Sequence, residues 1–481
     1  MSSSCPALRV PIIKSEPMRT DSLSLLLSPD EPAPMPTLCL AEILASLNCA
    51  LDLTSGQVPG HAERTCLIGI RLGAAVGLSA DEMQSLYHAL LMKDAGCSSN
   101  AARMFEIYGS DDIEAKYASK IIDWSNIVEA VKYAAAHTLP EGSLLARANK
   151  MLKLAGVGNV GDQLMQSRCS RGAQIALSLG FGEAAADCIK YLDEHWDGHG
   201  APHHLKADQI PILARIACVA QTLEVFQTTF GLGPAYEMLR ARSGRWFDPE
   251  LVRVAHSFRQ DDAFWYSVRE TPHTTLLGLD IEAATEPATD ERLDSVCDAF
   301  AQIVDSKSQF TGEHSSRVCE YTLEIAEGLG IAGERKTTLR RAALLHDIGK
   351  LAVPNTILDK NGKPTDEEWA CIRRHPYHTQ QILCRITGFE RLTEIASAHH
   401  ERLNGKGYFQ GLTADELDLD MRIIAVADVF DALSAKRPYR DALPIEKVFA
   451  ILDSDALDPD CVAVLKEFYG SAGSGTLLKA A

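Results

Sequence analysis

The feature that most constrains the fold is a series of histidines and aspartates placed on helix-like apolar runs in the second half of the chain. The run RRAALLHDIGK at 340–350 contains adjacent His346 and Asp347, which offer an imidazole nitrogen and a carboxylate oxygen side by side. Further residues of these types lie on or beside separate apolar runs: His314, His375, His399, His400 and Asp428. Burying so many imidazoles and charges is costly unless they are paired or share a cation. The pattern therefore predicts helices that converge on a metal centre.

Composition limits what such a chain does. With 46% apolar and 23% charged residues among 481, it is expected to be a soluble globular protein of two or more domains. The net charge of −18 argues against a nucleic-acid polymer or a membrane surface as a partner. No apolar run approaches the length of a membrane span. Thirteen scattered cysteines without a CxxC pair predict reduced thiols and a cytoplasmic location.

The ordered series, with Lys350 and the segment KRPYR at 436–440, resembles the HD-GYP family of bacterial phosphodiesterases. The resemblance covers about residues 291–445, and Gly407-Tyr408-Phe409 stands where the family has its GYP tripeptide. It implies hydrolysis of a cyclic dinucleotide, above all cyclic di-GMP, to pGpG by a metal-bridged hydroxide, and leaves open whether the product is cleaved further to GMP. It also implies two divalent metal ions, Fe or Mn, because Phe310 stands where three-metal members carry a glutamate.

The resemblance assigns roles to individual residues. Asp347 is the expected bridging and catalytic ligand, because one carboxylate can bind two cations through its two oxygens. Lys350 is expected to contact a phosphate oxygen and take part in catalysis, while Arg437 and Arg440 bind a second phosphate or a guanine edge. The expected metal ligands are His314, His346, Asp347, His375, His399, His400 and Asp428.

The resemblance also concerns partners. The glycine-rich loop Gly405–Phe409 follows the paired histidines, and in the family this loop is associated with protein contacts. A signalling protein of the GGDEF type, or another signalling protein, is the expected partner at this loop, and a homodimer is left open. Phe409 in place of proline loosens the backbone there, which bears on partner choice more than on catalysis.

The first half contains a repeat of this pattern. His61 precedes Asp94 by the same 33 residues that separate His314 from Asp347. Further along, the offset between the halves falls from 253 to 207, so the first copy carries an insertion of 46 residues (253 minus 207). The segment 101–126 is the expected location of this insertion. The pattern predicts an all-α protein with two tandem HD-type helical domains, of which the first is degenerate.

The first copy lacks most of the expected ligands. Lys93, Arg168 and Gln221 stand in place of His346, His375 and Asp428, and Leu192-Asp193 stands in place of the paired histidines. Fixed positive charge in a ligand shell excludes a metal cluster. We therefore expect a salt bridge among Lys93, Asp94 and Arg168, with a metal-free anion or nucleotide pocket as the functional alternative. His195 and His199 are expected to be surface or loop residues.

These observations predict a division of the chain into four segments. Residues 1–36 form a disordered Ser/Pro-rich tail, 37–270 the degenerate domain, 271–290 a linker and 291–481 the catalytic domain. Two alternatives to a cyclic di-GMP phosphodiesterase stay open. One is a cyclic GMP-AMP phosphodiesterase, and the other is a signalling scaffold that binds nucleotide without turnover.

Overall fold

The chain is helical throughout the part that the structure, a computed structural model, describes. That part comprises residues 39–140, 142–156, 160–308, 312–360, 362–435 and 441–470. Within these ranges only isolated bridges occur in place of strands, which confirms the predicted all-α class. The expected tail at 1–36 lies outside the described residues. No helix in these ranges is long and apolar enough to cross a membrane.

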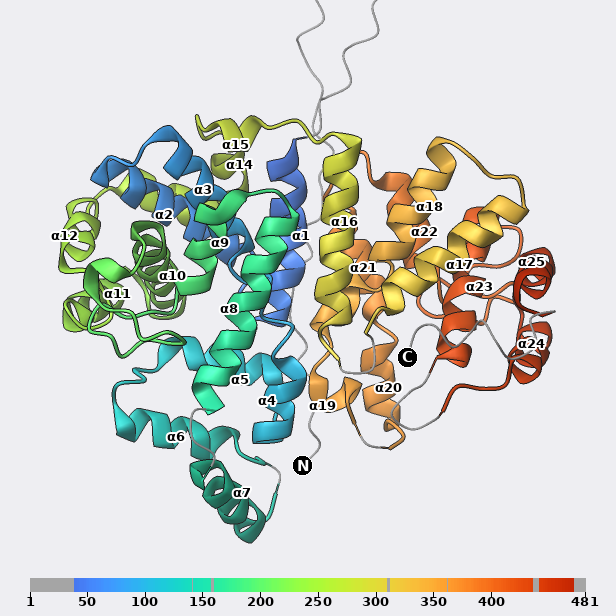
Figure 1. The fold of residues 1–481 in the computed structure, drawn as a ribbon, viewed down its shortest axis with the longest axis horizontal. Helices are drawn as coiled ribbons and strands as arrows, with labels where there is room; N and C mark the ends of the chain where they lie inside the picture. Colours follow the sequence, from blue (N-terminus) through green and yellow to red (C-terminus); the bar gives the residue numbers. More distant parts are fainter. Residues whose placement is uncertain are drawn as a thin grey trace, which may run out of the picture.

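The helices divide between the two halves of the chain (Figure 1). The first half contains α1 (Leu40–Thr54), α2 (His61–Val76), α3 (Ala80–Met92), α4 (Ala101–Tyr108), α5 (Asp112–Ile121), α6 (Ile127–His137), α7 (Leu144–Gly156), α8 (Val160–Ser178), α9 (Gly182–Tyr191), η1 (Ala207–Gln209), α10 (Ile212–Phe230), α11 (Leu232–Arg242), α12 (Pro249–Ser257), α13 (Asp262–Glu270), α14 (Pro272–Leu277) and α15 (Glu282–Thr285). The second half contains α16 (Asp290–Asp305), α17 (His314–Gly328), α18 (Glu334–Leu345), η2 (Ile348–Ala352), α19 (Asn355–Leu358), α20 (Asp366–Ile372), α21 (His375–Leu383), α22 (Glu390–Ser397), α23 (Leu419–Ser434), α24 (Ile445–Ser454) and α25 (Pro459–Tyr469).

The repeat seen in the sequence is also a repeat of hydrogen bonds. Asp52 accepts the backbone N–H groups of Gly60 and His61 at 2.7 and 3.0 Å, where α2 begins. In the second half, 253 residues on, Asp305 accepts the N–H of Ser315 at 3.1 Å, where α17 begins. Each carboxylate satisfies N–H groups that the first turn of a helix leaves unpaired. In both halves, therefore, an aspartate caps the helix that begins with the first histidine of the pattern, His61 or His314.

Two equivalent glycines show how closely the repeat is kept. A Cβ on Gly349, just after the His-Asp pair, would lie 2.0 Å from the carbonyl oxygen of His375. A Cβ on Gly96 would lie 1.9 Å from the carbonyl oxygen of Arg168. Because no side chain fits at either position, the loop after the pair packs directly against the helix that carries the next ligand position.

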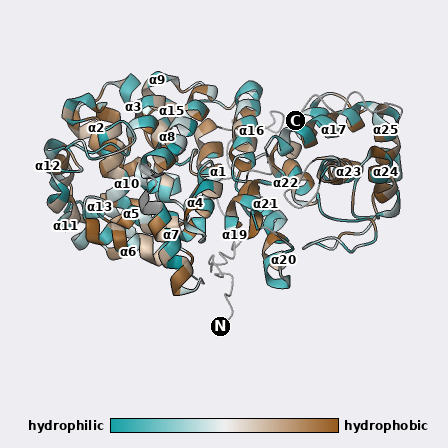
Figure 2. Cartoon of the chain, turned by 60° about the horizontal axis from the view of Figure 1, so that its bottom comes forward, coloured by the Kyte–Doolittle hydropathy of each residue, from teal (hydrophilic) through white to brown (hydrophobic). Residues whose placement is uncertain are grey.

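The inserted segment differs from its expected location. Adding the offset of 253 to the residue numbers of α4 gives a range that contains α19, so these two helices correspond. Adding the offset of 207 to the first residue number of α8 gives a residue of α20, so the repeat has resumed where α8 begins. The extra helices are therefore α5, α6 and α7, so the prediction of 101–126 began too early and ended too soon. Several of the large apolar side chains of α6 and α7 are exposed, including Ile127, Leu144 and Leu145. Figure 2 colours the chain by hydropathy and shows hydrophobic residues in both helices.

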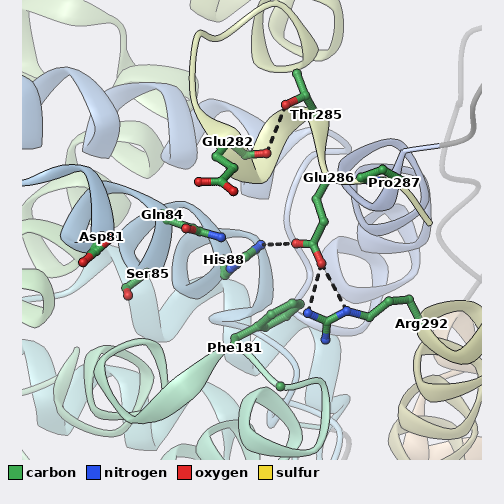
Figure 3. Close-up of a pocket in the computed structure, with 11 residues that line it drawn as sticks. Asp81, Gln84, Ser85, His88, Phe181, Glu282, Thr285, Glu286, Pro287 and Arg292 are labelled. Atoms are coloured by element: carbon green, nitrogen blue, oxygen red, sulfur yellow. Dashed lines mark hydrogen bonds and ion pairs between the residues drawn. The ribbon is translucent and has the colours of Figure 1, made fainter. Parts of the chain in front are cut away.

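The halves are packed together along two central helices, α1 and α16 (Figure 1). Helix α1 packs against α2 and α3 of its own half and against η2 and α21 of the other. The segment 271–290, expected as a linker, is folded into α14 and α15, and Leu276, Ala283 and Ala284 are buried in it. Figure 3 shows Glu286 from this segment between His88 of α3 and Arg292 of α16, at 3.8 and 3.0 Å.

The inserted helix α5 also contacts the second half. Asp112 is fully buried, and its carboxylate accepts the backbone N–H of Asn355 at 2.9 Å. Lys116 and Lys307 lie at 2.8 and 3.5 Å from the same carboxylate, and Lys307 is itself buried. A buried carboxylate is tolerated because these two ammonium groups and the N–H compensate for its lost hydration. The start of the insertion is thereby anchored on the segment that follows η2.

Candidate metal centre

The second half brings all the expected ligands into one buried cluster. His314 and His375 are the first residues of α17 and α21, and Asp428 lies within α23. His346 and Asp347 follow the end of α18, and His399 and His400 follow the end of α22. Helix ends are suited to this task because their side chains point into the space where several helices meet. All seven side chains are buried except that of His400, which is partly exposed.

Asp347 is the centre of the cluster. The Nε2 atoms of His314 and His346 lie 3.2 and 3.3 Å from its Oδ2. On the other side, the Nε2 atoms of His375 and His399 lie 3.2 and 3.7 Å from its Oδ1. The two carboxylate oxygens thus face two separate pairs of imidazoles, which is the arrangement that a bridging carboxylate requires.

A second carboxylate, that of Asp428, also lies among the imidazoles. Asp428 Oδ1 lies 3.4 Å from His314 Nε2, and its Oδ2 lies 3.5 Å from His400 Nδ1. Two groups of donors result, each with its ligand atoms within 4.8 Å of one another. One group comprises His314, His346 and Asp347, and the other comprises His375, His399 and His400.

Hydrogen bonds at Nδ1, on the side of the ring away from Asp347, fix the orientation of three of the imidazoles. The Nδ1 atoms of His346, His375 and His399 lie 2.6, 2.7 and 2.6 Å from the carbonyl oxygens of Ala343, Ile372 and Ala396. A nitrogen this close to a carbonyl must donate a proton, so the Nε2 of each neutral ring carries a lone pair toward Asp347. Carbonyl or carboxylate partners of this kind are typical of metal-binding histidines.

His314 is oriented by a carboxylate that sequence reasoning missed. Its Nδ1 lies 2.6 Å from Oδ2 of Asp431, which Arg317 also holds through bonds of 2.5 and 3.1 Å. Asp431 follows Asp428 by three residues on α23, so both carboxylates lie on one face of that helix. This spacing is the signal that would have found it.

The donors fit a divalent cation. Among the described residues, His314 Nε2, His346 Nε2 and Asp347 Oδ1 are buried and have no hydrogen-bond partner. In addition, Nε2 of His375 and Nε2 of His399 are 3.0 Å apart while both Nδ1 atoms are engaged with carbonyls. Two lone pairs that face each other repel unless a positive charge lies between them. Bound metal ions would satisfy each of these atoms.

The charge states of most of the cluster suit a metal. Burial would raise the pKa of Asp347, but Lys350 and the neighbouring histidines outweigh it and hold that pKa well below its usual range. Burial, together with the neighbouring imidazoles, lowers the pKa values of His399 and His400 well below theirs. His314 differs, because burial would lower its pKa but hydrogen bonds to Asp347, Asp428 and Asp431 outweigh that effect and raise its pKa to about 10, so a metal would have to displace its proton. Ionised carboxylates and neutral imidazoles are the protonation states in which these side chains bind metals.

The expected substrate-binding residues are placed only in part. Lys350 lies in η2 and contacts Asp347 directly, with its side chain 19% exposed. Its ammonium group is therefore at the edge of the cluster, and its contact with a phosphate stays a prediction. Arg437 and Arg440 lie outside the described residues, as does Phe310.

The glycine-rich loop contributes a wall to the site. The Tyr408 ring lies 4.3 Å from that of His400, and the Arg373 guanidinium lies 5.4 Å from the Tyr408 ring centre. A Cβ on Gly407 would lie 2.5 Å from the Cα of Glu401, which explains the glycine. Binding of a protein partner by this loop stays a prediction. Within the loop, the side chain of Phe409 is partly exposed. Tyr408 instead faces the cluster.

In the first half, ammonium groups stand where the second half places its donors. Lys93 Nζ lies 2.7 Å from Nε2 of His61 and contacts Asp94 directly. Lys120, from the inserted helix α5, lies 3.1 Å from the other oxygen of Asp94. On the outer side, His61 Nδ1 contacts Glu224, the counterpart of Asp431. Side-chain cations therefore satisfy the atoms whose counterparts form the candidate metal site of the other copy, as expected for a degenerate HD domain.

One expectation for the first half is corrected and another is refined. Arg168 does not join Lys93 and Asp94, because its Nη1 pairs with Asp193 at 2.8 Å, and Lys120 takes the expected place. His195 lies in the loop between α9 and η1, as one of its two expected locations, but it is buried there, and its ring stacks on Trp246 at 4.1 Å. His199 is exposed, as expected. Sequence register could not reveal Lys120, since the insertion has no counterpart in the second half.

A buried His-Asp doublet surrounded by histidines from several helices defines an HD-type hydrolase site. Comparison with known proteins agrees: the family model described as "HD domain" matches residues 119–251 and 298–460, in both halves. The chain belongs to the HD domain family and, by its motifs and its relatives, to the HD-GYP phosphodiesterases.

Individual relatives refine this assignment. A 3'3'-cGAMP-specific phosphodiesterase 3 of Vibrio cholerae is 43% identical over 90% of this chain and 95% of that protein. The crystal structure of a cyclic GMP-AMP specific phosphodiesterase from V. cholerae matches with a TM-score of 0.62 and 39% identity, covering 90% of this chain and 98% of that one. A cyclic di-GMP phosphodiesterase response regulator of Xanthomonas campestris is 36% identical over 37% of this chain and 48% of that protein.

Proposed function

We propose that the second half hydrolyses a cyclic dinucleotide and that its preferred substrate is 3'3'-cGAMP. The observation that carries the hydrolytic part is the convergence of four imidazoles on the two oxygens of Asp347. The relative that matches nearly the whole chain is named for 3'3'-cGAMP, whereas the relative named for cyclic di-GMP matches less than half of it. This support reverses the order expected from the sequence, in which cyclic di-GMP came first.

We assign two divalent ions, Fe or Mn, to the cluster. The donors fall into two groups with Asp347 between them, and the histidine-rich set with carboxylates suits these metals. When bound, the ions would supply Lewis-acid stabilisation of the charge that develops on the phosphate and would lower the pKa of water. The proposed ligands are His314, His346, Asp347, His375, His399, His400 and Asp428.

Other side chains would position the substrate. Lys350, at the edge of the cluster, is placed to release Asp347 and take a phosphate oxygen when metal neutralises that carboxylate. Tyr408 and Arg373 form an aromatic and cationic wall beside His400, where a nucleobase or phosphate would lie. Contact by Arg437 and Arg440, a protein partner at Gly405–Phe409 and a homodimer stay predictions.

A non-catalytic scaffold is the less favoured function. The first half shows what a copy without metal chemistry looks like: its cluster carries Lys93, Lys120 and Arg168. The second half has His346 and His375 at the positions of Lys93 and Arg168, and among the described residues His314 Nε2, His346 Nε2 and Asp347 Oδ1 are buried without a hydrogen-bond partner. A protein that only bound nucleotide would not need seven convergent metal donors.

The substrate assignment predicts a ranking of rates. Protein reconstituted with Fe or Mn should cleave 3'3'-cGAMP at least about tenfold faster, by kcat/KM, than cyclic di-GMP or cyclic di-AMP, a difference of about 1.4 kcal/mol in transition-state binding. Products separated by liquid chromatography would give the rates. A preference for cyclic di-GMP would contradict the substrate, and no turnover of any cyclic dinucleotide with metal bound would favour the scaffold.

A further inference from the structure

The first half contains a cavity at the position that the metal centre occupies in the second. Its volume is about 280 Å³, and it is lined at its inner end by Lys120, Arg168, Asp193 and Gln221. By the offset of 207, the last three correspond to His375, His400 and Asp428 of the proposed metal site. We name this cavity the first-half pocket. It is distinct from the catalytic cluster and has no assigned role.

A separate pocket, with a volume of about 540 Å³, lies where the halves meet (Figure 3). It is lined by His88, Glu286 and Arg292 among others, and Glu286 pairs there with both His88 and Arg292.

Unpartnered polar atoms line the first-half pocket. Among the described residues, Nε and Nη2 of Arg168, Oε1 of Gln221, Oδ1 of Asn100 and Nδ1 of His195 are buried without a hydrogen-bond partner. Each of these four side chains is more than nine-tenths buried. A buried polar group without a partner costs about 1–3 kcal/mol, and native proteins contain few of them. Four in one cavity indicate a site built for a polar ligand.

The charge of the pocket selects the class of ligand. Three cationic side chains, Lys116, Lys120 and Arg168, and two carboxylates, Asp162 and Asp193, are among the residues that line the pocket. The excess of positive charge excludes a metal ion and favours an anion. Arg168 still has two N–H-bearing nitrogens free, and a guanidinium binds phosphate through pairs of such groups.

The outer end of the pocket is aromatic and is built by the inserted segment. Trp124 follows α5, is 39% exposed, and lies edge-to-face with Tyr133 of α6 at 5.1 Å. Tyr108 of α4 lies 5.9 Å from the same Tyr133 ring. Aromatic side chains at the mouth of a cationic pocket provide faces on which a nucleobase can stack. In the part of the catalytic half that the structure describes, α5–α7 have no counterpart, so Trp124 and Tyr133 belong to the first copy alone.

We propose that the first-half pocket binds a nucleoside monophosphate without metal. Its phosphate would lie against Arg168 and Lys120, and its base would stack near Trp124. The free oxygens of Asn100 and Gln221 would accept hydrogen bonds from the sugar or base. A volume of 280 Å³ is near the lower limit of about 300 Å³ for small-molecule sites, which suits one nucleotide rather than a cyclic dinucleotide.

Calorimetric titration of the full chain with GMP and AMP tests this proposal. We expect one site per chain with metal chelated by EDTA, and equal affinity in the Asp347→Asn variant, because the catalytic cluster is not involved. Arg168→Gln should weaken binding by about tenfold or more, since it removes charge-assisted hydrogen bonds. Absence of binding at millimolar nucleotide, or binding that Asp347→Asn abolishes, would overturn the proposal.

A second variant tests the proposal even if Arg168→Gln does not fold. Trp124→Ala removes a partly exposed side chain and should weaken GMP binding by about fivefold or more, while weak binding of inorganic phosphate stays unchanged. Trp369→Ala, which removes a similarly exposed tryptophan from α20, is the matched control and should bind GMP as the wild type does. Equal GMP affinity in the Trp124→Ala and Trp369→Ala variants would contradict the placement of the base.

Discussion

Replacing Asp347 with asparagine should abolish hydrolysis and strip the protein of metal. The substitution keeps the shape of the side chain but removes the negative charge that faces His314, His346, His375 and His399. Loss of a residue that merely orients a ligand costs about 10–100-fold, so loss of a shared ligand should cost more than about 100-fold in kcat/KM. Turnover of 3'3'-cGAMP and metal content by mass spectrometry would measure both effects.

The fold should survive this change. Asp347 lies among four imidazoles and Lys350, whose side chain is partly exposed and can turn toward water. Circular dichroism of the variant should therefore match that of the wild type. Full metal occupancy together with full activity in Asp347→Asn would show that the cluster has been assigned wrongly.

Replacing Asp94 with asparagine should have the opposite pattern, with a loss of stability and no loss of metal. Asp94 is the counterpart of Asp347, but it lies between Lys93 and Lys120. Without its charge, buried Lys93 has no ionised partner in direct contact, and breaking a buried pair costs about 3–5 kcal/mol. The midpoint of urea unfolding should fall, while the metal content of folded protein stays at the wild-type value.

The pH dependence of this variant provides an internal check. Burial already lowers the pKa of Lys93, and without Asp94 that pKa falls further below its value in the unfolded chain. The unfolded state then binds more protons than the folded state, so stability rises with pH as Lys93 loses its proton. The deficit of Asp94→Asn should therefore shrink between neutral and alkaline pH. A constant deficit would argue against Lys93 as its cause.

Much of the fold and of the site could be predicted from the sequence because the signals are local. The apolar runs around His314, His346 and Asp428 have helical spacing, and the structure brings their side chains together as expected. The repeat was visible because the spacing from His61 to Asp94 equals that from His314 to Asp347. These features depend on residue type and interval, which a sequence states directly.

The features that were missed depend on contacts between distant segments. Lys120 belongs to an insertion, so no register could place it beside Asp94. His195 was expected to be a surface or loop residue because its counterpart is Arg402. It lies in a loop, but it is buried there because Trp246, 51 residues further along, stacks on its ring. Asp112 gave no sign that it would be buried against Lys307 and Asn355 of the other half. Packing between elements of this kind is not encoded in any short motif.

The central claim is that one half of the chain holds metal and the other has replaced it with side-chain cations. Anomalous X-ray scattering from crystals of the full chain loaded with Mn tests this most directly, because it locates each ion. We expect two peaks beside Asp347, among His314, His346, His375, His399 and Asp428, and none beside Asp94. A peak between His61 and Asp94, or no peak beside Asp347 in catalytically active protein, would contradict the account.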